Sequence, residues 1–265
     1  PIVWLDHHEP VKMAGSLKKV KYFNPQLKGK NIPTPALCYE AFPVVLKSKG
    51  LWLAGLGSFA EWFVPEFLDE FKKDFPELLP SKWKTPGDVI YNSKLGKLIE
   101  LFSFALKGET SAVKKNIKLL SDIDGPDELL AGVSKSATTL WKHHSMIRKE
   151  YDLLLSRAVR GAGDGVLFVF KYENAKHSLT KDLANELSYQ FPGRIIVLAR
   201  RQSGEFRCSF RCQNRDVRAL VEQALKGLHG YSGGHEVAAG GAVREDDFDE
   251  FLKRLEELAR DKTAE

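Results

Sequence analysis

The chain has 265 residues, 43% of them hydrophobic, and a formal net charge of +5, which fits one large or two smaller globular domains. This composition, with 28% charged residues, excludes wholesale disorder. No run approaches the ~20 apolar residues that cross a bilayer, which excludes an integral membrane protein. The cysteines Cys38, Cys208 and Cys212 are too few and too scattered for a disulfide framework, so we expect a cytoplasmic protein.

The first half of the chain predicts one short strand followed by helices. Residues 2–5 are an apolar run, and polar residues just past such a strand lie where open α/β sheets bind ligands. Residues 51–56 fit either a strand or a helix. Asp127 is expected to cap a long helix that ends near residue 159. Helical spacing of apolar residues recurs at 36–47, 65–75, 93–107 and 110–121.

From residue 161 the pattern changes to strands alternating with helices. Strands are predicted at 166–170, 194–200 and 205–212. Helices are predicted at 178–190, 215–229 and 246–260, with a glycine-rich loop before the last. A unit of about 100 residues with this order is typical of a separate α/β domain.

Arginines are concentrated in one stretch of this second half. The planar guanidinium fork suits phosphate, so the cluster indicates an anionic ligand more strongly than the mild net charge does. Its members are Arg194, Arg200, Arg201, Arg207, Arg211, Arg215 and Arg218.

Asp6, His7 and His8 directly follow the first predicted strand. Neutral imidazole is a ligand for metals such as Mn²⁺ or Zn²⁺, and an adjacent carboxylate can orient it. The tripeptide alone leaves open a surface histidine pair without a role. His143 and His144 fall within the predicted long helix, where neighbouring side chains diverge by ~100°, so no shared site is expected there.

The glycine-rich segment 232–241 is a second candidate site. Glycines let a backbone approach a phosphate closely, and a histidine can bond a phosphate or sugar oxygen. The apolar residues 237–239 indicate a packed segment rather than a linker. Arg211, on the preceding strand, is expected to face it. The candidate binding residues of the segment are Ser232, Gly233, Gly234, His235 and Gly240.

Two further motifs are weaker. Cys208 and Cys212 have no second pair of thiols, so we expect buried side chains rather than a metal site. Glu61 is a single carboxylate within the apolar segment 57–65. It could contact a metal or stabilise a helix N-terminus.

Together these motifs resemble the DHH–DHHA1 phosphoesterase superfamily, which includes RecJ-type exonucleases. Asp6-His7-His8 matches its first signature, and Gly233-Gly234-His235 followed by Ala238-Ala239-Gly240 matches its second. Ser209-Phe210-Arg211 matches the strand before the glycine motif. The stretch 57–65 and the helical insertion are most similar to archaeal RecJ-like, GINS-associated nucleases.

The resemblance implies an α/β fold in three parts. Residues 1–125 would be the C-terminal part of a parallel-sheet DHH domain with a helical insertion. Residues 126–160 would be a connector helix. Residues 161–265 would be a smaller α/β DHHA1 domain that binds substrate.

The resemblance also implies phosphodiester hydrolysis by two metal ions, Mn²⁺ or Mg²⁺. His7 would be a metal ligand, Asp6 its supporting carboxylate, and His8 would face the phosphate. Glu61 stands where the family has a ligand aspartate and reaches one methylene further. The nucleic-acid backbone would be held by Arg211, Ser232, Gly233, Gly234, His235 and Gly240.

The family's first aspartate motifs lie upstream of the DHH residues, and only five residues precede Asp6 here. We therefore expect an incomplete two-metal site, which a missing N-terminal segment or a partner chain would complete. The predicted function is exonucleolytic cleavage of single-stranded DNA or RNA. One alternative is a catalytically inactive scaffold that binds single strands in a GINS-type replication complex. Another is a phosphodiesterase for oligonucleotides or cyclic dinucleotides.

Overall fold

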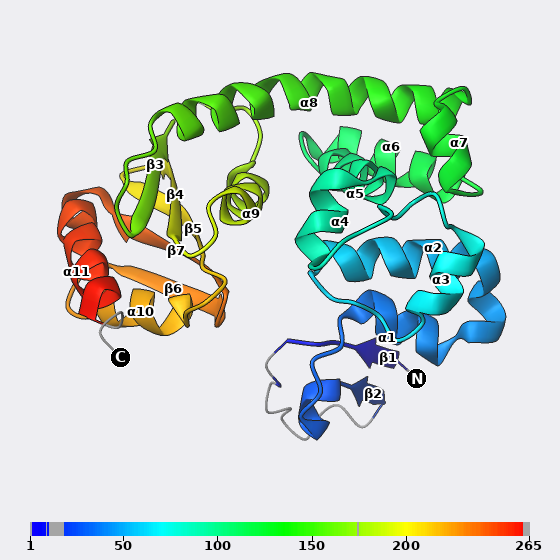
Figure 1. Ribbon diagram of the computed structural model, residues 1–265, viewed down its shortest axis with the longest axis horizontal. Coiled ribbons are helices and arrows are strands. Elements are labelled where there is room, and N and C mark those ends of the chain that lie inside the picture. The colour runs from blue at the N-terminus through cyan, green and yellow to red at the C-terminus, as the bar shows by residue number, and fades with distance from the viewer. Residues whose placement is uncertain (1, 9, 11–18, 174, 262–265) are drawn as a thin grey trace. The chain divides into compact units, whose positions relative to one another are not determined.

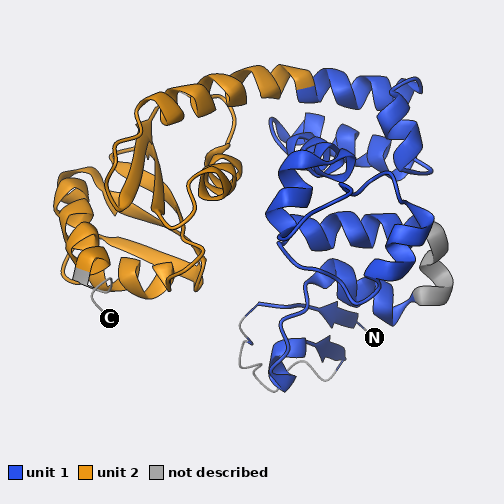
Figure 2. Ribbon diagram, viewed as in Figure 1, with its two compact units in different colours: residues 1–144 blue, residues 145–265 orange. Residues whose placement is uncertain are grey.

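The computed structural model describes residues 2–8, 10, 19–173 and 175–261 (Figure 1). Its contacts divide the chain into two compact units, Pro1–His144 and Ser145–Glu265 (Figure 2). The boundary falls inside α8 (Lys135–Arg160), within the predicted connector. Among the described residues, no helix has the length and apolar character needed to cross a membrane.

Unit 1 begins with two short parallel strands, β1 (Ile2–Leu5) and β2 (Val20–Phe23). The sequence predicts only β1, because the alternating residues of β2 are too few to stand out. A short 3₁₀ helix, η1 (Pro25–Lys28), follows β2. The helices of unit 1 that precede α8 are α1 (Thr34–Ala41), α2 (Pro43–Ala60), α3 (Leu68–Asp74), α4 (Pro86–Asn92), α5 (Lys94–Ala105), α6 (Thr110–Ser121) and α7 (Pro126–Ala131).

The prediction of one long helix that begins at Asp127 is wrong for its first residues. Two helices occupy the segment, because α7 ends at Gly132, whose φ of 67° is left-handed and stops a helix. The backbone then enters α8 at Lys135. The ambiguous residues 51–56 are helical and lie within α2.

The core of unit 1 forms where α2 meets α3 and α5. Trp52, Phe59 and Phe71 are fully buried there. A Cβ on Gly55 would lie 2.2 Å from the Phe71 ring, so α3 packs closely on α2 because residue 55 has no side chain. This helical core supports the small β1–β2 sheet, which α1 contacts.

Unit 2 is a five-stranded sheet in the order β3-β4-β5-β7-β6. Only β3 and β4 are parallel, and the other pairs are antiparallel. α10 and α11 cover one face, where Val197, Phe210 and Phe251 are buried, and α9 packs on the other face against β4 and β5. The elements are β3 (Leu167–Tyr172), α9 (Thr180–Gln190), β4 (Ile195–Gln202), β5 (Glu205–Arg211), α10 (Val217–Ala224), β6 (Gly230–His235), β7 (Ala238–Arg244) and α11 (Phe248–Asp261).

The predicted glycine-rich loop is instead a β-hairpin, formed by β6 and β7. Glycine normally weakens a strand, which is why the sequence pattern indicates a loop. Here the close approach of the two strands requires it. A Cβ on Gly241 would lie 2.1 Å from the carbonyl oxygen of Tyr231 on the paired strand. The hairpin therefore presents the glycines on an ordered sheet.

Candidate functional site

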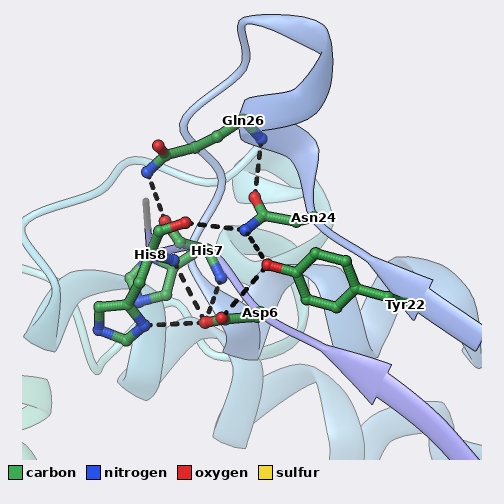
Figure 3. A network of polar contacts seen from close by, with 6 residues as sticks. All are labelled: Asp6, His7, His8, Tyr22, Asn24 and Gln26. Carbon is green, nitrogen blue, oxygen red and sulfur yellow. Dashed lines mark hydrogen bonds and ion pairs between the residues drawn. The ribbon is translucent and has the colours of Figure 1, made fainter. Parts of the chain in front are cut away.

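The residues Asp6, His7 and His8 leave the carboxyl end of β1, beside the end of β2 (Figure 3). Leu5 is paired with Phe23, and the Asp6 N–H donates to the Phe23 carbonyl at 3.0 Å. Side chains that follow adjacent parallel strands emerge at the same edge of the sheet. The predicted position of this motif, at the end of a strand, is confirmed.

The Asp6 carboxylate organises this turn. Its Oδ1 accepts the His7 N–H at 2.8 Å and contacts the His8 Nδ1 at 2.8 Å. The bond with the His8 ring is the main reason that the pKa of Asp6 lies below its ordinary value of 3.8. Asp6 therefore remains ionised and holds the His8 imidazole in one orientation.

Asn24, at the end of β2, fixes the same turn from the second strand. Its Nδ2 donates to the His8 carbonyl at 2.8 Å and to the Tyr22 hydroxyl at 2.7 Å. Its Oδ1 accepts the Gln26 N–H at 2.9 Å, and Gln26 Nε2 donates to the His7 carbonyl at 2.5 Å (Figure 3). Sequence reasoning missed these supporting residues because their role depends on the pairing of β2 with β1.

The donor atoms of this turn fit one imidazole ligand of a metal. A histidine whose Nδ1 bonds a carboxylate is oriented to ligate through Nε2, and here that histidine is His8. Glu61 follows the last residue of α2 and is exposed. Among the described residues, no group of three or more His, Cys, Asp or Glu side chains could hold a metal ion. The roles of His7 and Glu61 as metal ligands remain predictions.

The second candidate site is the face of β5, β7 and β6 that α10 and α11 do not cover. The strand register sets its residues in three rows, each made of directly opposed positions. We call this surface the glycine face. Its rows are Arg211–Ala238–His235, Ser209–Gly240–Gly233 and Arg207–Ala242–Tyr231.

The middle row is a strip of almost bare backbone. A Cβ on Gly233 would meet no atom within 4 Å, and one on Gly240 would meet only the Cys208 carbonyl oxygen, at 3.7 Å. Packing within the protein therefore does not require glycine at these two positions. A ligand that lies close against the backbone does require it.

Arg211 borders this strip in a fixed position. Its Nε donates to Asn185 Oδ1 on α9 at 2.6 Å, and its Nη1 donates to the Phe210 carbonyl at 2.7 Å. In the same row, on the far side of Ala238 in β7, lies His235, which is exposed. An anchored guanidinium and an imidazole thus flank the glycine strip, as a phosphate site needs.

Of the arginines in the sequence cluster, only Arg207 and Arg211 belong to the rows of the glycine face. Arg194, Arg200 and Arg215 donate to backbone carbonyls of β3, of the segment after β3 and of α11, respectively. Arg201 and Arg218 lie beside carboxylates. The density of arginines along the sequence therefore overstates the charge on the glycine face.

Ser232 and Gly234 alternate onto the opposite side of β6 from Gly233. The Ser232 hydroxyl is buried without a hydrogen-bond partner. Any contact of these two residues with substrate would involve their backbone, and their binding role stays a prediction. The predicted burial of Cys208 and Cys212 is confirmed, and burial raises the pKa of Cys208 to about 12.

Comparisons with known proteins agree with this architecture. Residues 164–261 match the family described as the DHHA1 domain. The Mn²⁺ complex of RecJ from Thermus thermophilus has 16% identity and a TM-score of 0.64 over 97% of this chain. A pGpG-specific phosphodiesterase from Vibrio cholerae has 13% identity and a TM-score of 0.53 over 98% of this chain. No curated protein matches the chain by sequence.

Residues 164–261 therefore match the DHHA1 domain, and the chain as a whole shares the fold of the RecJ structure. This architecture is RecJ-like, which confirms the expected fold. The chain spans 41% of the length of the Thermus RecJ and 84% of the Vibrio phosphodiesterase.

Proposed function

We propose that this chain is part of a metal-dependent phosphodiesterase that cleaves single-stranded nucleic acid from an end. The glycine strip carries this proposal, because Gly233 and Gly240 leave a bare backbone surface that no internal contact requires. Arg211 and His235 flank it with groups that bind phosphate. The RecJ-like fold supports the same class of reaction.

The two candidate sites would divide the work. The glycine face would hold the sugar–phosphate backbone of the strand, and Asp6 would hold the His8 imidazole so that its Nε2 could bind the metal. A bound Mn²⁺ or Mg²⁺ would supply hydroxide at neutral pH and stabilise charge on the phosphate. His8, with His7 or Glu61, would provide part of the metal site. We propose that an N-terminal segment or a partner chain provides the remaining carboxylates.

A second candidate is a phosphodiesterase for dinucleotides. It is favoured by the Vibrio structure, which is pGpG-specific and of which this chain covers 84%. Its substrate also has phosphodiester bonds, so the same glycine strip could bind it. The two candidates differ in how much of the glycine face the ligand covers.

The test measures binding and cleavage separately on the full chain. We expect a fluorescein-labelled oligothymidylate to bind, and the His235→Ala variant to bind it more weakly. With Mn²⁺ and the protein that supplies the remaining ligands, we expect shortening of the strand. His8→Ala should abolish shortening while leaving binding unchanged, because His8 lies outside the glycine face.

Three outcomes would contradict the proposal in different ways. Faster hydrolysis of pGpG than of the long strand would favour the dinucleotide candidate. Strand binding without cleavage under every combination would favour a scaffold, for which we propose a GINS-type replication complex as partner. Absence of strand binding would remove the nucleic-acid proposal altogether.

A further inference from the structure

The glycine face has a third row whose side chains the proposed phosphate site does not use. Arg207 on β5 and Tyr231 on β6 occupy it, with Ala242 of β7 between them. The Tyr231 side chain is 58% exposed although it is a large aromatic group on a sheet. An exposed aromatic ring beside the proposed phosphate site offers a π-face on which a base can stack.

The pair is held in place before any ligand arrives. Arg207 Nη1 donates to the Tyr231 hydroxyl at 2.8 Å, and Arg207 Nε lies 2.6 Å from Glu205 Oε1. The two side chains bridge β5 and β6 over Ala242, which is only 1% exposed. A flat phenol ring and a flat guanidinium therefore form a preordered surface, so a ligand that stacks on them loses little side-chain entropy.

The position of this pair relates it to the glycine strip. Rows on one face of a sheet repeat every second residue, so the Tyr231 row lies about 7 Å beyond Gly233 and about 14 Å beyond His235. A ligand that contacts both the His235 row and Tyr231 must extend across all three rows. An extended strand can do this with its backbone on the glycines and a base over the ring.

We propose that Tyr231, held by Arg207, is a base-stacking subsite for single-stranded nucleic acid, next to the phosphate-binding glycine strip. This inference rests on the proposed function and adds a contact to bases rather than to phosphates. Stacking on an aromatic ring is tolerant of sequence because every base has a π-face.

The experiment compares Tyr231→Ala, Tyr231→Phe and Leu153→Ala in the full chain. Leu153 lies on α8 in the same unit, and its exposure of 57% matches that of Tyr231. The probes are two labelled strands of equal length, an oligothymidylate and a strand made entirely of abasic nucleotides. Both carry the same phosphates, but only the first carries bases.

We expect Tyr231→Ala to weaken binding of the oligothymidylate about 5- to 150-fold and to leave the abasic strand unaffected. Tyr231→Phe keeps the ring and should retain most of the affinity, while Leu153→Ala should change nothing. Equal weakening for both strands, or an equal loss in the Phe and Ala variants, would overturn the stacking subsite. Unchanged binding of both strands by Tyr231→Ala would overturn it too and leave the proposed function standing. If the unaltered chain binds neither strand, the proposed function itself fails.

Discussion

The two candidate sites are built by different means. The turn at Asp6–His8 depends on side-chain hydrogen bonds that reach across a sheet of only two strands. The glycine face depends on backbone pairing inside a five-stranded sheet, with a packed core behind it. The first site is therefore sensitive to the loss of single polar atoms, whereas the second is sensitive to the addition of side-chain volume.

The exposed surface around the two sites differs in the same way. Ile2, Val3 and Phe23 on β1 and β2 are all more than half exposed, so the two-stranded sheet leaves apolar area uncovered. In unit 2 the β5 positions directly behind the glycine face, Phe206, Cys208 and Phe210, are buried. The turn at Asp6–His8 therefore lies beside more exposed apolar surface than the glycine face does.

We expect the largest effects from substitutions of two neighbouring glycines, one of which should reduce stability and the other strand binding. Gly241→Val should destabilise unit 2 by about 3 kcal/mol, because its Cβ would lie 2.1 Å from the Tyr231 carbonyl oxygen. Gly240→Val should change stability by less than about 0.5 kcal/mol but abolish strand binding, because its side chain fills the strip. Urea denaturation and fluorescence anisotropy measure the two effects. Equal stability of the two variants would show that the hairpin is looser than its register indicates.

A smaller effect is expected at the first site. Asn24→Ala should cost about 1–2 kcal/mol locally, because the Asn24 side chain is 6% exposed and its removal leaves the His8 carbonyl and the Tyr22 hydroxyl without its hydrogen bonds. Hydrogen exchange of the His7 and His8 amides should accelerate, and exchange in unit 2 should not change. Leu27→Ala, in the adjacent η1 and 63% exposed, is the matched control. Unaltered exchange at both histidine amides would mean that β1 alone holds the turn.

Acid should affect the two sites differently. The pKa of Asp6 is lower in the folded protein than its ordinary 3.8, so its stabilising contribution is fully present above pH 3.8 and is lost as the pH falls through the lower folded value. Amide resonances of His7 and His8 should report this step, and those of β6 and β7 should not. In Asp6→Asn the step should disappear. A step that persists in that variant would assign it to another group.

The last prediction concerns Cys208 and Cys212, which we expect to resist alkylation. Burial raises the pKa of Cys208 to about 12, and Cys212 is fully buried. Iodoacetamide at pH 8 should therefore add at most one label to the native chain, at the partly exposed Cys38. Peptide mass spectrometry locates the label. Modification of Cys208 before unfolding would indicate that the sheet opens more readily than its packing indicates.

The sequence predicts the local elements well where one physical pattern dominates. The apolar run at residues 2–5, the helical spacing at 93–107 and 110–121, and the strands predicted at 194–200 and 205–212 all agree with the structure, which joins these two strands in a hairpin. At that hairpin, Ser203 and Gly204 both adopt positive φ values, as a tight turn requires. The prediction was wrong at α7, where the left-handed Gly132 interrupts the helix, and at β6–β7, where glycine composition indicates a loop.

The sequence alone identifies the two motifs for which we propose a chemical role, because Asp6-His7-His8 and Gly233-Gly234-His235 are contiguous in the chain. The arrangement of their side chains depends on the tertiary structure. It pairs Asp6 with the His8 ring through a turn that β2 supports, and it sets Arg211 and Tyr231 on either side of a bare strip. These relations depend on strand pairing between residues distant in sequence. A one-residue change of register would turn every such side chain to the opposite face.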